Sequence, residues 1–254
     1  MTSEPGHMRE GFSGAIFDVD GVLVDSPHER AWRDVLQELM YGPWSDVRDQ
    51  TAWSPEAFTA QVYHEVVSGK PRMSGALAAL EHFEVPDAQA RMREYADRKQ
   101  AMVVKLIEAG EFTAYPDALR FIVAVKQSGI EVAAASSSKN AGLFLRQIRP
   151  RPGQTLLGIF DADVSGRDFA RGKPHPEMFL TAAKELGHPP RDCFVIEDAV
   201  AGVQAARAGG MSAIGVARAD DYDLLTDAHA DVVVTTLDDI DLDALREGRL
   251  AKRG

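Results

Sequence analysis

The stretch Ala15-Ile16-Phe17-Asp18-Val19-Asp20-Gly21-Val22-Leu23 decides the fold of this chain. An apolar run of this length predicts a buried strand, and Asp-Gly predicts the turn that ends it. Residues two apart on a strand point to the same face, so Asp18 and Asp20 bring two carboxylates into one small space. The pair repels itself unless a cation lies between the groups or one of them holds a proton. Both arrangements suit phosphoryl transfer, in which one carboxylate attacks phosphorus beside Mg²⁺ and the other moves a proton.

Composition and charge narrow the class of protein. The 254 residues are enough for one large domain or two unequal ones, and 45% hydrophobic with 26% charged residues is typical of a globular chain. The net charge of −11 argues against a nucleic-acid partner, which would need a basic face. No apolar stretch reaches the roughly 18 residues of a membrane-spanning helix, so we expect no membrane partner. The polar segment Met1–Ser13 predicts a mobile preamble rather than a secretory signal. The single cysteine, Cys193, excludes an internal disulfide and fits a cytoplasmic location.

Beyond Pro116 the hydrophobic pattern alternates between helical and strand-like runs. This alternation predicts right-handed crossovers and an α/β fold, a doubly wound (Rossmann-like) parallel sheet. The expected helices are 117–128, 139–149, 177–186 and 199–208, and the strand-like runs are 130–135, 156–160, 193–196, 212–216 and 231–234.

The chain between about Ser26 and Thr113 differs from the rest, because it shows helical periodicity and no convincing strand. The expected helices are 28–40, 55–67, 74–83 and 87–109. We therefore expect an all-helical cap domain over 26–113, inserted into a core domain of 1–25 and 114–254. Open α/β sheets bind ligands at the carboxyl ends of their strands, where a helical module on two linkers can act as a lid.

Four further segments carry polar groups suited to phosphate chemistry. Hydroxyls and backbone N–H groups at a helix start bind anions, and a lysine held in a proline turn neutralises charge beside them. Paired carboxylates hold Mg²⁺, and the planar fork of arginine binds phosphate. Taken singly, each segment is equally well a helix cap, a solvated cation or an exposed loop. The segments are Ser136–Asn140, Arg171–Pro176, Glu197-Asp198, and Gly69–Arg72 together with Lys99.

The order of these segments along one chain resembles the haloacid dehalogenase superfamily, and within it the β-phosphoglucomutase-like group of sugar-phosphate enzymes. The resemblance covers Ala15 to about Val234. It implies that Asp18 is the nucleophile that forms an aspartyl-phosphate and that Asp20 is the general acid/base. It also implies that Ser136 and Lys173 hold the phosphoryl group.

The resemblance implies a cofactor and a substrate as well. Mg²⁺ would be held by Asp18, the backbone carbonyl of Asp20, Asp198 and, directly or through water, Glu197. The substrate would be a small phosphorylated sugar, and the protein a monomer or small homo-oligomer. The implied substrate-binding residues are His28, Arg72 and Lys99 of the cap with Ser138, Lys139 and Asn140 of the core.

Three functions fit these residues. The first is a β-phosphoglucomutase that interconverts β-glucose 1-phosphate and glucose 6-phosphate through a bisphosphate. The second is a sugar-phosphate phosphatase of the same fold, in which water accepts the phosphoryl group. The third is a non-catalytic sugar-phosphate binding protein, which the complete set of expected catalytic groups disfavours. The cap cations Arg72 and Lys99 suit a second phosphate and favour the mutase.

Overall fold

The computed structural model describes residues 11–68, 70–219 and 221–254, so most of the predicted preamble Met1–Ser13 and Gly69 of the Gly69–Arg72 loop lie outside the described residues. The chain forms two compact units. One comprises the chain up to Asp25 together with Thr113–Gly254, and the other is Ser26–Phe112. Thr113, which we expected at the end of the helical domain, belongs to the first unit.

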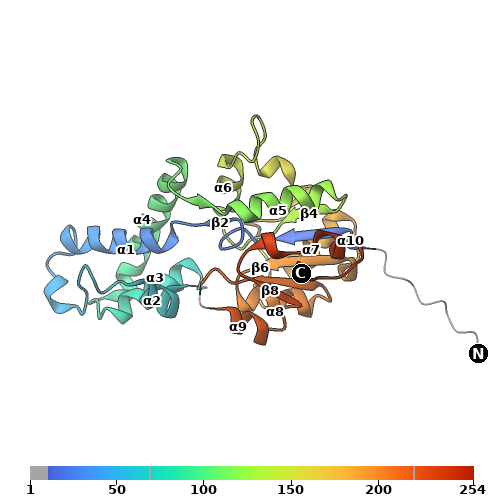
Figure 1. Ribbon diagram of the computed structural model, residues 1–254. Helices are drawn as coiled ribbons and strands as arrows, with labels where there is room; N and C mark the ends of the chain where they lie inside the picture. The colour runs from blue at the N-terminus through green and yellow to red at the C-terminus, as the bar shows by residue number, and fades with distance from the viewer. Residues whose placement is uncertain (1–10, 69, 220) are drawn as a thin grey trace, which may run out of the picture. The chain divides into compact units, whose positions relative to one another are not determined.

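The first unit is built on a six-stranded parallel sheet in the order β5-β4-β1-β6-β7-β8 (Figure 1). This confirms the predicted α/β doubly wound parallel sheet. Its strands are β1 (Gly14–Phe17), β4 (Glu131–Ala134), β5 (Ala162–Asp163), β6 (Cys193–Glu197), β7 (Ser212–Val216) and β8 (Val232–Val234).

Helices cover both faces of this sheet, which explains why its central strands read as continuous apolar runs. Ile16 and Val195 face one layer, where they join a core that includes Phe179 of α7 and Val203 of α8. Phe17 faces the other layer, and its ring centroid lies 6.1 Å from that of Phe121 on α5. The helices of this unit are α5 (Pro116–Gln127), α6 (Ala141–Gln147), α7 (Glu177–Leu186), α8 (Val200–Ala208), α9 (Tyr222–Asp227) and α10 (Leu242–Arg246).

The register of the central strands brings three strand ends together. Phe17, the last residue of β1, pairs with Ala134 of β4 on one side and with Ile196 of β6 on the other. The segments that follow these residues, which contain Asp18, Ser136 and Glu197, therefore begin at the same edge of the sheet.

Three local predictions differ from the structure. The helix expected over 55–67 begins only at Ala60, as the short helix α2 (Ala60–Val62) followed by a π-helical turn at Tyr63–Val67. The apolar run 156–160 forms a short 3₁₀ turn, Leu157–Ile159, and the edge strand β5 follows it at Ala162–Asp163. The helix expected from Lys139 begins at Ala141, because Ser138 and Asn140 lie in a turn in which the N–H of Ala141 donates to the carbonyl of Ser138. Apolar composition alone does not separate a short strand from a helical turn.

The second unit consists of helices joined by turns, and its described residues include no strand. Its core includes Trp32, Leu36, Leu80 and Tyr95, and the Tyr95 hydroxyl donates to the carbonyl of Trp32 at 2.7 Å. The helices are α1 (His28–Tyr41), α2 (Ala60–Val62), α3 (Arg72–His82) and α4 (Ala88–Glu108), with a π-helical turn at Tyr63–Val67. The chain enters and leaves this unit next to an antiparallel pair, β2 (Val24–Asp25) with β3 (Thr113–Ala114).

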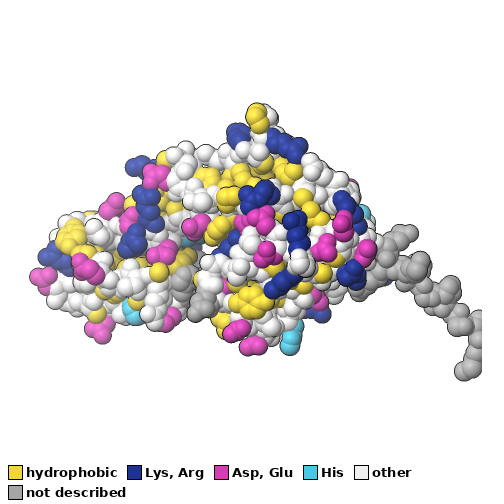
Figure 2. Space-filling model, in the orientation of Figure 1, with side chains coloured by type: hydrophobic (Ala, Val, Ile, Leu, Met, Phe, Trp, Pro, Cys, Tyr) yellow, Lys and Arg dark blue, Asp and Glu magenta, His cyan; other side chains and the backbone are white. Residues whose placement is uncertain are grey.

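The described surface carries charges of both signs. Figure 2 shows acidic and basic side chains interspersed over the face in view, without a continuous basic area. Within the described ranges, no helix is both long enough and apolar enough to cross a membrane.

Candidate active site

The site centres on Asp18, the residue that follows β1. Its N–H still donates to the carbonyl of Ile196, so the sheet fixes its backbone. Lys173, which precedes α7, reaches the Asp18 carboxylate with its ammonium, and Nζ lies 2.6 Å from Oδ1. The same ammonium donates to the carboxylate of Glu197 at the end of β6. Segments far apart in the sequence thus place one lysine between two buried acids.

Burial controls the ionisation of this group. The Asp18 side chain is 8% exposed and that of Glu197 is 1% exposed. Burial raises the pKa of Asp18 to about 7, against the lowering effect of Lys173; Glu197 and Asp20 add to the rise. Burial alone lowers the pKa of Lys173, but Asp18 and then Glu197 raise it, and the net shift is upward. A buried carboxylate that faces a cation on one side is a nucleophile in a defined orientation.

Glu197 is fully engaged by its neighbours. Besides Lys173, its carboxylate accepts hydrogen bonds from the N–H groups of Asp198 at 3.1 Å and Ala199 at 3.2 Å. Its side chain also packs against Gly202 of α8, where a Cβ would lie 2.1 Å from Oε1. Glu197 therefore orients Lys173 and the start of α8, and a direct contact with a metal stays a prediction.

Asp198 lies against the turn that carries Asp20. A Cβ built on Gly21 would lie 1.8 Å from Asp198 Oδ2, and Gly21 has a φ of +84°. Only glycine permits both this backbone conformation and this close approach. Burial raises the pKa of Asp198 well above its usual range, and Glu197 and Asp18 raise it further.

These residues fit a divalent cation. The charge of Glu197 contributes to the raised pKa of Asp18 and of Asp198, while Lys173 supplies a single positive charge. Carboxylates in such surplus are the ligands that Mg²⁺ prefers. Among the residues that the structure describes, no three acidic, histidine or cysteine side chains already converge on one metal-binding point. The Lys173 ammonium lies between two of these carboxylates, and a metal ion held by them stays a prediction.

The segment after β4 is held by hydrogen bonds of its own and by an ion pair at the surface. Ser136 is buried, and its Oγ accepts a hydrogen bond from the N–H of Ser138 at 3.2 Å. Ser138 Oγ in turn accepts from the N–H of Asn140, which is also buried. Lys139 is exposed, and its Nζ contacts Asp168 at 2.6 Å and the carbonyl of Gly166 at 2.8 Å. The predicted substrate role of Lys139 thus competes with a surface ion pair.

The substrate residues predicted in the helical unit form two groups. Lys99 of α4 is buried, with Nζ 3.3 Å from His28 Nδ1 and 4.7 Å from the ring centroid of Trp32. Arg72, at the start of α3, is 44% exposed and lies 3.6 Å from Asp97. An ion pair this long and this exposed contributes little, so the Arg72 guanidinium retains capacity for a ligand.

Sequence reasoning missed Arg218, which follows β7. Its guanidinium contacts Asp117 and the carbonyls of Gly21 and Val22 in the turn that carries Asp20. The signal was available, because Arg218 stands just beyond a predicted strand at the ligand-binding edge of the sheet. It lacks a surrounding motif and was therefore not singled out.

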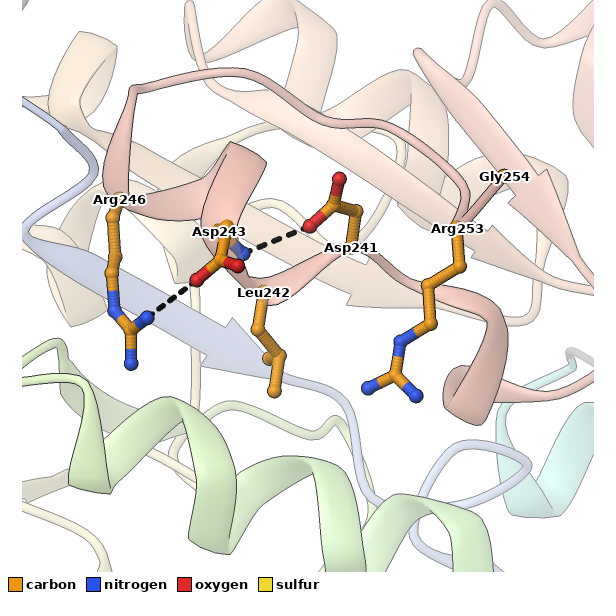
Figure 3. Close-up of a pocket in the computed structure, with 6 residues that line it drawn as sticks. All are labelled: Asp241, Leu242, Asp243, Arg246, Arg253 and Gly254. Atoms are coloured by element: carbon orange, nitrogen blue, oxygen red, sulfur yellow. Dashed lines mark hydrogen bonds and ion pairs between the residues drawn. The ribbon is translucent and has the colours of Figure 1, made fainter.

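A separate hollow lies on the C-terminal segment (Figure 3). Its volume is about 440 Å³, and it shares no residue with the site described above. Leu242, Asp243 and Arg246 of α10 are among the residues drawn, and Arg246 pairs with Asp243 at 2.6 Å. The lining residues are Asp241, Leu242, Asp243, Arg246, Arg253 and Gly254.

Comparison with known proteins agrees with this geometry. Residues 12–210 match the family model of haloacid dehalogenase-like hydrolases. The chain is 31% identical to the β-phosphoglucomutase of Bacillus subtilis over 235 residues, which are 91% of this chain and 93% of that protein. It is 30% identical to the fructose-1-phosphate phosphatase YqaB of Escherichia coli, over 82% of this chain and 98% of that protein.

Among solved structures, the β-phosphoglucomutase of the archaeon Pyrococcus sp. strain ST04 is similar with a TM-score of 0.69 and 31% identity. That alignment covers 91% of this chain and 96% of the archaeal one. The chain belongs to the haloacid dehalogenase-like hydrolase family. It is an enzyme of this type, a phosphotransferase or phosphatase, and its relatives include both phosphomutases and phosphatases.

Proposed function

We propose that this protein is a Mg²⁺-dependent phosphoryl transferase that interconverts β-glucose 1-phosphate and glucose 6-phosphate through an aspartyl-phosphate on Asp18. The observation that supports this most directly is the buried Asp18 carboxylate with Lys173 Nζ at 2.6 Å. This pair offers an oriented nucleophile beside a cation that can neutralise a transferring phosphoryl group. The similarity to two β-phosphoglucomutases supports the choice of sugar.

The first transfer uses two carboxylates in different roles. Asp18 attacks phosphorus, and the bond between phosphorus and the sugar oxygen breaks. Asp20, in its protonated form, gives its proton to that oxygen, which leaves as a hydroxyl. In the second transfer Asp20 takes the proton of the incoming hydroxyl, whose oxygen attacks phosphorus and releases Asp18 as a carboxylate.

The remaining core residues stabilise the phosphoryl group. The Lys173 ammonium is held by Asp18 and Glu197, so its position is set before substrate arrives. A preorganised charge of this kind need not reorient in the transition state, which makes it effective in catalysis. The buried Ser136 hydroxyl is assigned to the same phosphoryl group.

Asp18, the backbone carbonyl of Asp20, and Asp198 are the residues that would hold Mg²⁺. When bound, the ion would neutralise charge on the phosphoryl oxygens and on the assembled carboxylates. Glu197 is assigned to Lys173 rather than to the ion, because its carboxylate oxygens already accept three hydrogen bonds from named donors.

The helical unit is proposed to supply the groups that bind a second phosphate. Arg72 is the main candidate, and Lys99 with His28 is the second. A mutase must hold a bisphosphate, whereas a phosphatase such as the relative YqaB needs no second phosphate site. A sugar-phosphate phosphatase is therefore the alternative function, and the role of Arg72 separates the two.

Phosphorus NMR tests the proposal. The protein is incubated with Mg²⁺, β-glucose 1-phosphate and a trace of glucose 1,6-bisphosphate. We expect glucose 6-phosphate to form without inorganic phosphate, and no product from Asp18→Asn. Inorganic phosphate as the main product would assign the protein as a phosphatase. Undiminished turnover by Asp18→Asn would overturn the mechanism itself.

Arg72→Ala tests the second phosphate site. It should reduce mutase turnover far more than hydrolysis of a small aryl phosphate, which has no second phosphate. Arg98→Ala is the matched control, because Arg98 is 45% exposed on α4 and pairs with Glu94 at 2.8 Å. An equal effect of the Arg72 change on both substrates would remove the reason to prefer the mutase.

A further inference from the structure

The turn that carries Asp20 is fixed by a network outside the predicted catalytic set. Within the turn, the N–H of Gly21 donates to the carbonyl of Val24 at 2.8 Å. The N–H groups of Leu23 and Val24 both donate to the carbonyl of Val19. These bonds close the turn but leave the carbonyls of Gly21, Val22 and Leu23 to be satisfied from outside. Buried carbonyls require donors, so the groups that supply them also determine where the turn lies.

Arg218 supplies two of these donors. Its Nε donates to the carbonyl of Gly21 at 3.3 Å, and its Nη2 donates to the carbonyl of Val22 at 3.2 Å. The guanidinium carries its donors in a rigid plane, so both bonds form only in one orientation of the side chain. The Arg218 side chain is 15% exposed, and an unpaired guanidinium at this depth would be costly.

Asp117 sets that orientation. The guanidinium makes its third hydrogen bond to Asp117, from Nη1 to Oδ2 at 2.9 Å. The same oxygen accepts from the N–H of Leu237 at 2.8 Å and from Thr236 Oγ1 at 3.2 Å. Asp117 is at the first turn of α5, and its side chain is 9% exposed. The carboxylate is therefore immobilised by the framework, and it immobilises the arginine.

Tyr115 ties the same turn to the start of α5. Its N–H donates to the carbonyl of Leu23 at 3.0 Å, and its ring lies under the guanidinium with the Arg218 Cζ 3.9 Å from the ring centroid. A cation stacked this closely on an aromatic face gains further attraction. All three carbonyls of the turn thus receive bonds from Arg218 or Tyr115.

We infer that Arg218 is a positioning residue for Asp20, acting through the Gly21–Val22 backbone to place the acid/base carboxyl. The inference rests on the proposed function, because it assumes that Asp20 protonates the leaving oxygen. The position of the turn has little freedom, since Asp198 Oδ2 already fills the space where Gly21 would carry a Cβ. A turn released by Arg218 would misplace Asp20 while Asp18 stays fixed by the sheet.

Leaving-group dependence tests this role, because the first transfer needs the proton of Asp20 only when the leaving group is poor. The rate of the first transfer, read as release of the leaving group in a single turnover, is measured at saturating Mg²⁺ with β-glucose 1-phosphate and with acetyl phosphate, whose leaving group needs no proton. Asp20→Asn should lose on the order of 100-fold or more with the sugar phosphate and far less with acetyl phosphate. Arg218→Lys should show the same selective loss at roughly tenfold or more, because lysine keeps the charge but not the planar fork.

Two further variants complete the design. Arg207→Lys is the matched control: Arg207 pairs with Asp231 at 2.7 Å near the opposite end of β7, so neither substrate should be affected. If Arg218→Lys does not fold, Asp117→Asn weakens the anchor of the same guanidinium and should reproduce the selective loss on a smaller scale. The double variant Asp20→Asn with Arg218→Lys should discriminate no more than Asp20→Asn alone.

The outcomes distinguish a failure of the positioning role of Arg218 from a failure of the acid/base role of Asp20. Equal losses by Arg218→Lys on both substrates, or no loss on either, would overturn the positioning role while Asp20→Asn remains selective. If Asp20→Asn lowered the rate by the same factor on both substrates, the proposed acid/base role of Asp20 would be overturned. The inference about Arg218 would then fail with it.

Discussion

Replacing Gly21 by alanine should disable the enzyme through one methyl group. The substitution has a backbone cost, because a left-handed conformation near the φ of +84° costs an L-residue about 1–2 kcal/mol. It also has a steric cost, since the new Cβ would lie 1.8 Å from Asp198 Oδ2 and 2.3 Å from Cγ. Ordinary contact begins at 3.4 Å, so either the turn or the Asp198 carboxylate must move.

The required movement sets the size of the effect. Restoring ordinary contact needs a displacement of more than about 1 Å, and a misplacement of that size costs on the order of 100-fold in rate. Asp198 is also a proposed Mg²⁺ ligand. We therefore expect Gly21→Ala to lower kcat/KM by about 100-fold or more and to raise the Mg²⁺ concentration for half-maximal activity at least tenfold.

Gly129→Ala is the matched control for this experiment. Gly129 has a φ of +85°, and a Cβ there would meet nothing within 4 Å. This variant should lose about 1–2 kcal/mol of unfolding free energy and keep its activity and Mg²⁺ dependence. Activity is assayed by mutase turnover across a Mg²⁺ titration, and stability by chemical denaturation. If Gly21→Ala matched Gly129→Ala in both, the close approach of Asp198 to the turn would have no catalytic importance.

Three other changes test the electrostatics. Burial raises the pKa of Asp18 to about 7, so in EDTA the folded state holds more protons than the unfolded state between about pH 4 and 7. The free energy of unfolding should therefore fall with rising pH in that window, and it should fall less in Asp18→Asn. Urea denaturation measures this, and parallel pH profiles for the variant and the unmodified protein would contradict it. Lys173→Met leaves Asp18 and Glu197 buried without their cation and should cost about 3–5 kcal/mol in EDTA. A partial recovery on adding Mg²⁺ is expected in thermal denaturation, and an equal midpoint with and without Mg²⁺ would argue against the cation site. Asp117→Ala leaves the Arg218 guanidinium unpaired and should cost a similar amount, whereas a loss below about 1 kcal/mol in urea would show that Tyr115 and the turn carbonyls suffice.

Much of the fold was predictable because its signals are local. The alternating helices and strands after Pro116 and the strand-free helical stretch between Ser26 and Phe112 follow from the spacing of apolar residues. Failures came where an apolar run was too short to have a period, as at 156–160, and where loop hydrogen bonds delayed a helix, as at Ser138–Asn140.

The candidate site was predictable where residues end strands. In a parallel sheet all strands end at one edge, so the sequence by itself determined that Asp18, Ser136 and Glu197-Asp198 would gather there. It also supplied the residue types that suit phosphoryl transfer, namely two acids followed by glycine and a lysine followed by proline.

Only the tertiary structure decided which of these groups touch. Lys173 contacts Asp18 across 155 positions of sequence, and Arg218 contacts the Gly21 carbonyl across 197. Such pairings depend on strand register and on the direction of each side chain, which no local pattern encodes. The same long-range packing places Glu197 against Lys173 and Asp198 against Gly21, although the two acids are adjacent and chemically alike. The two neighbouring acids therefore make different contacts, because the packing around each side chain differs.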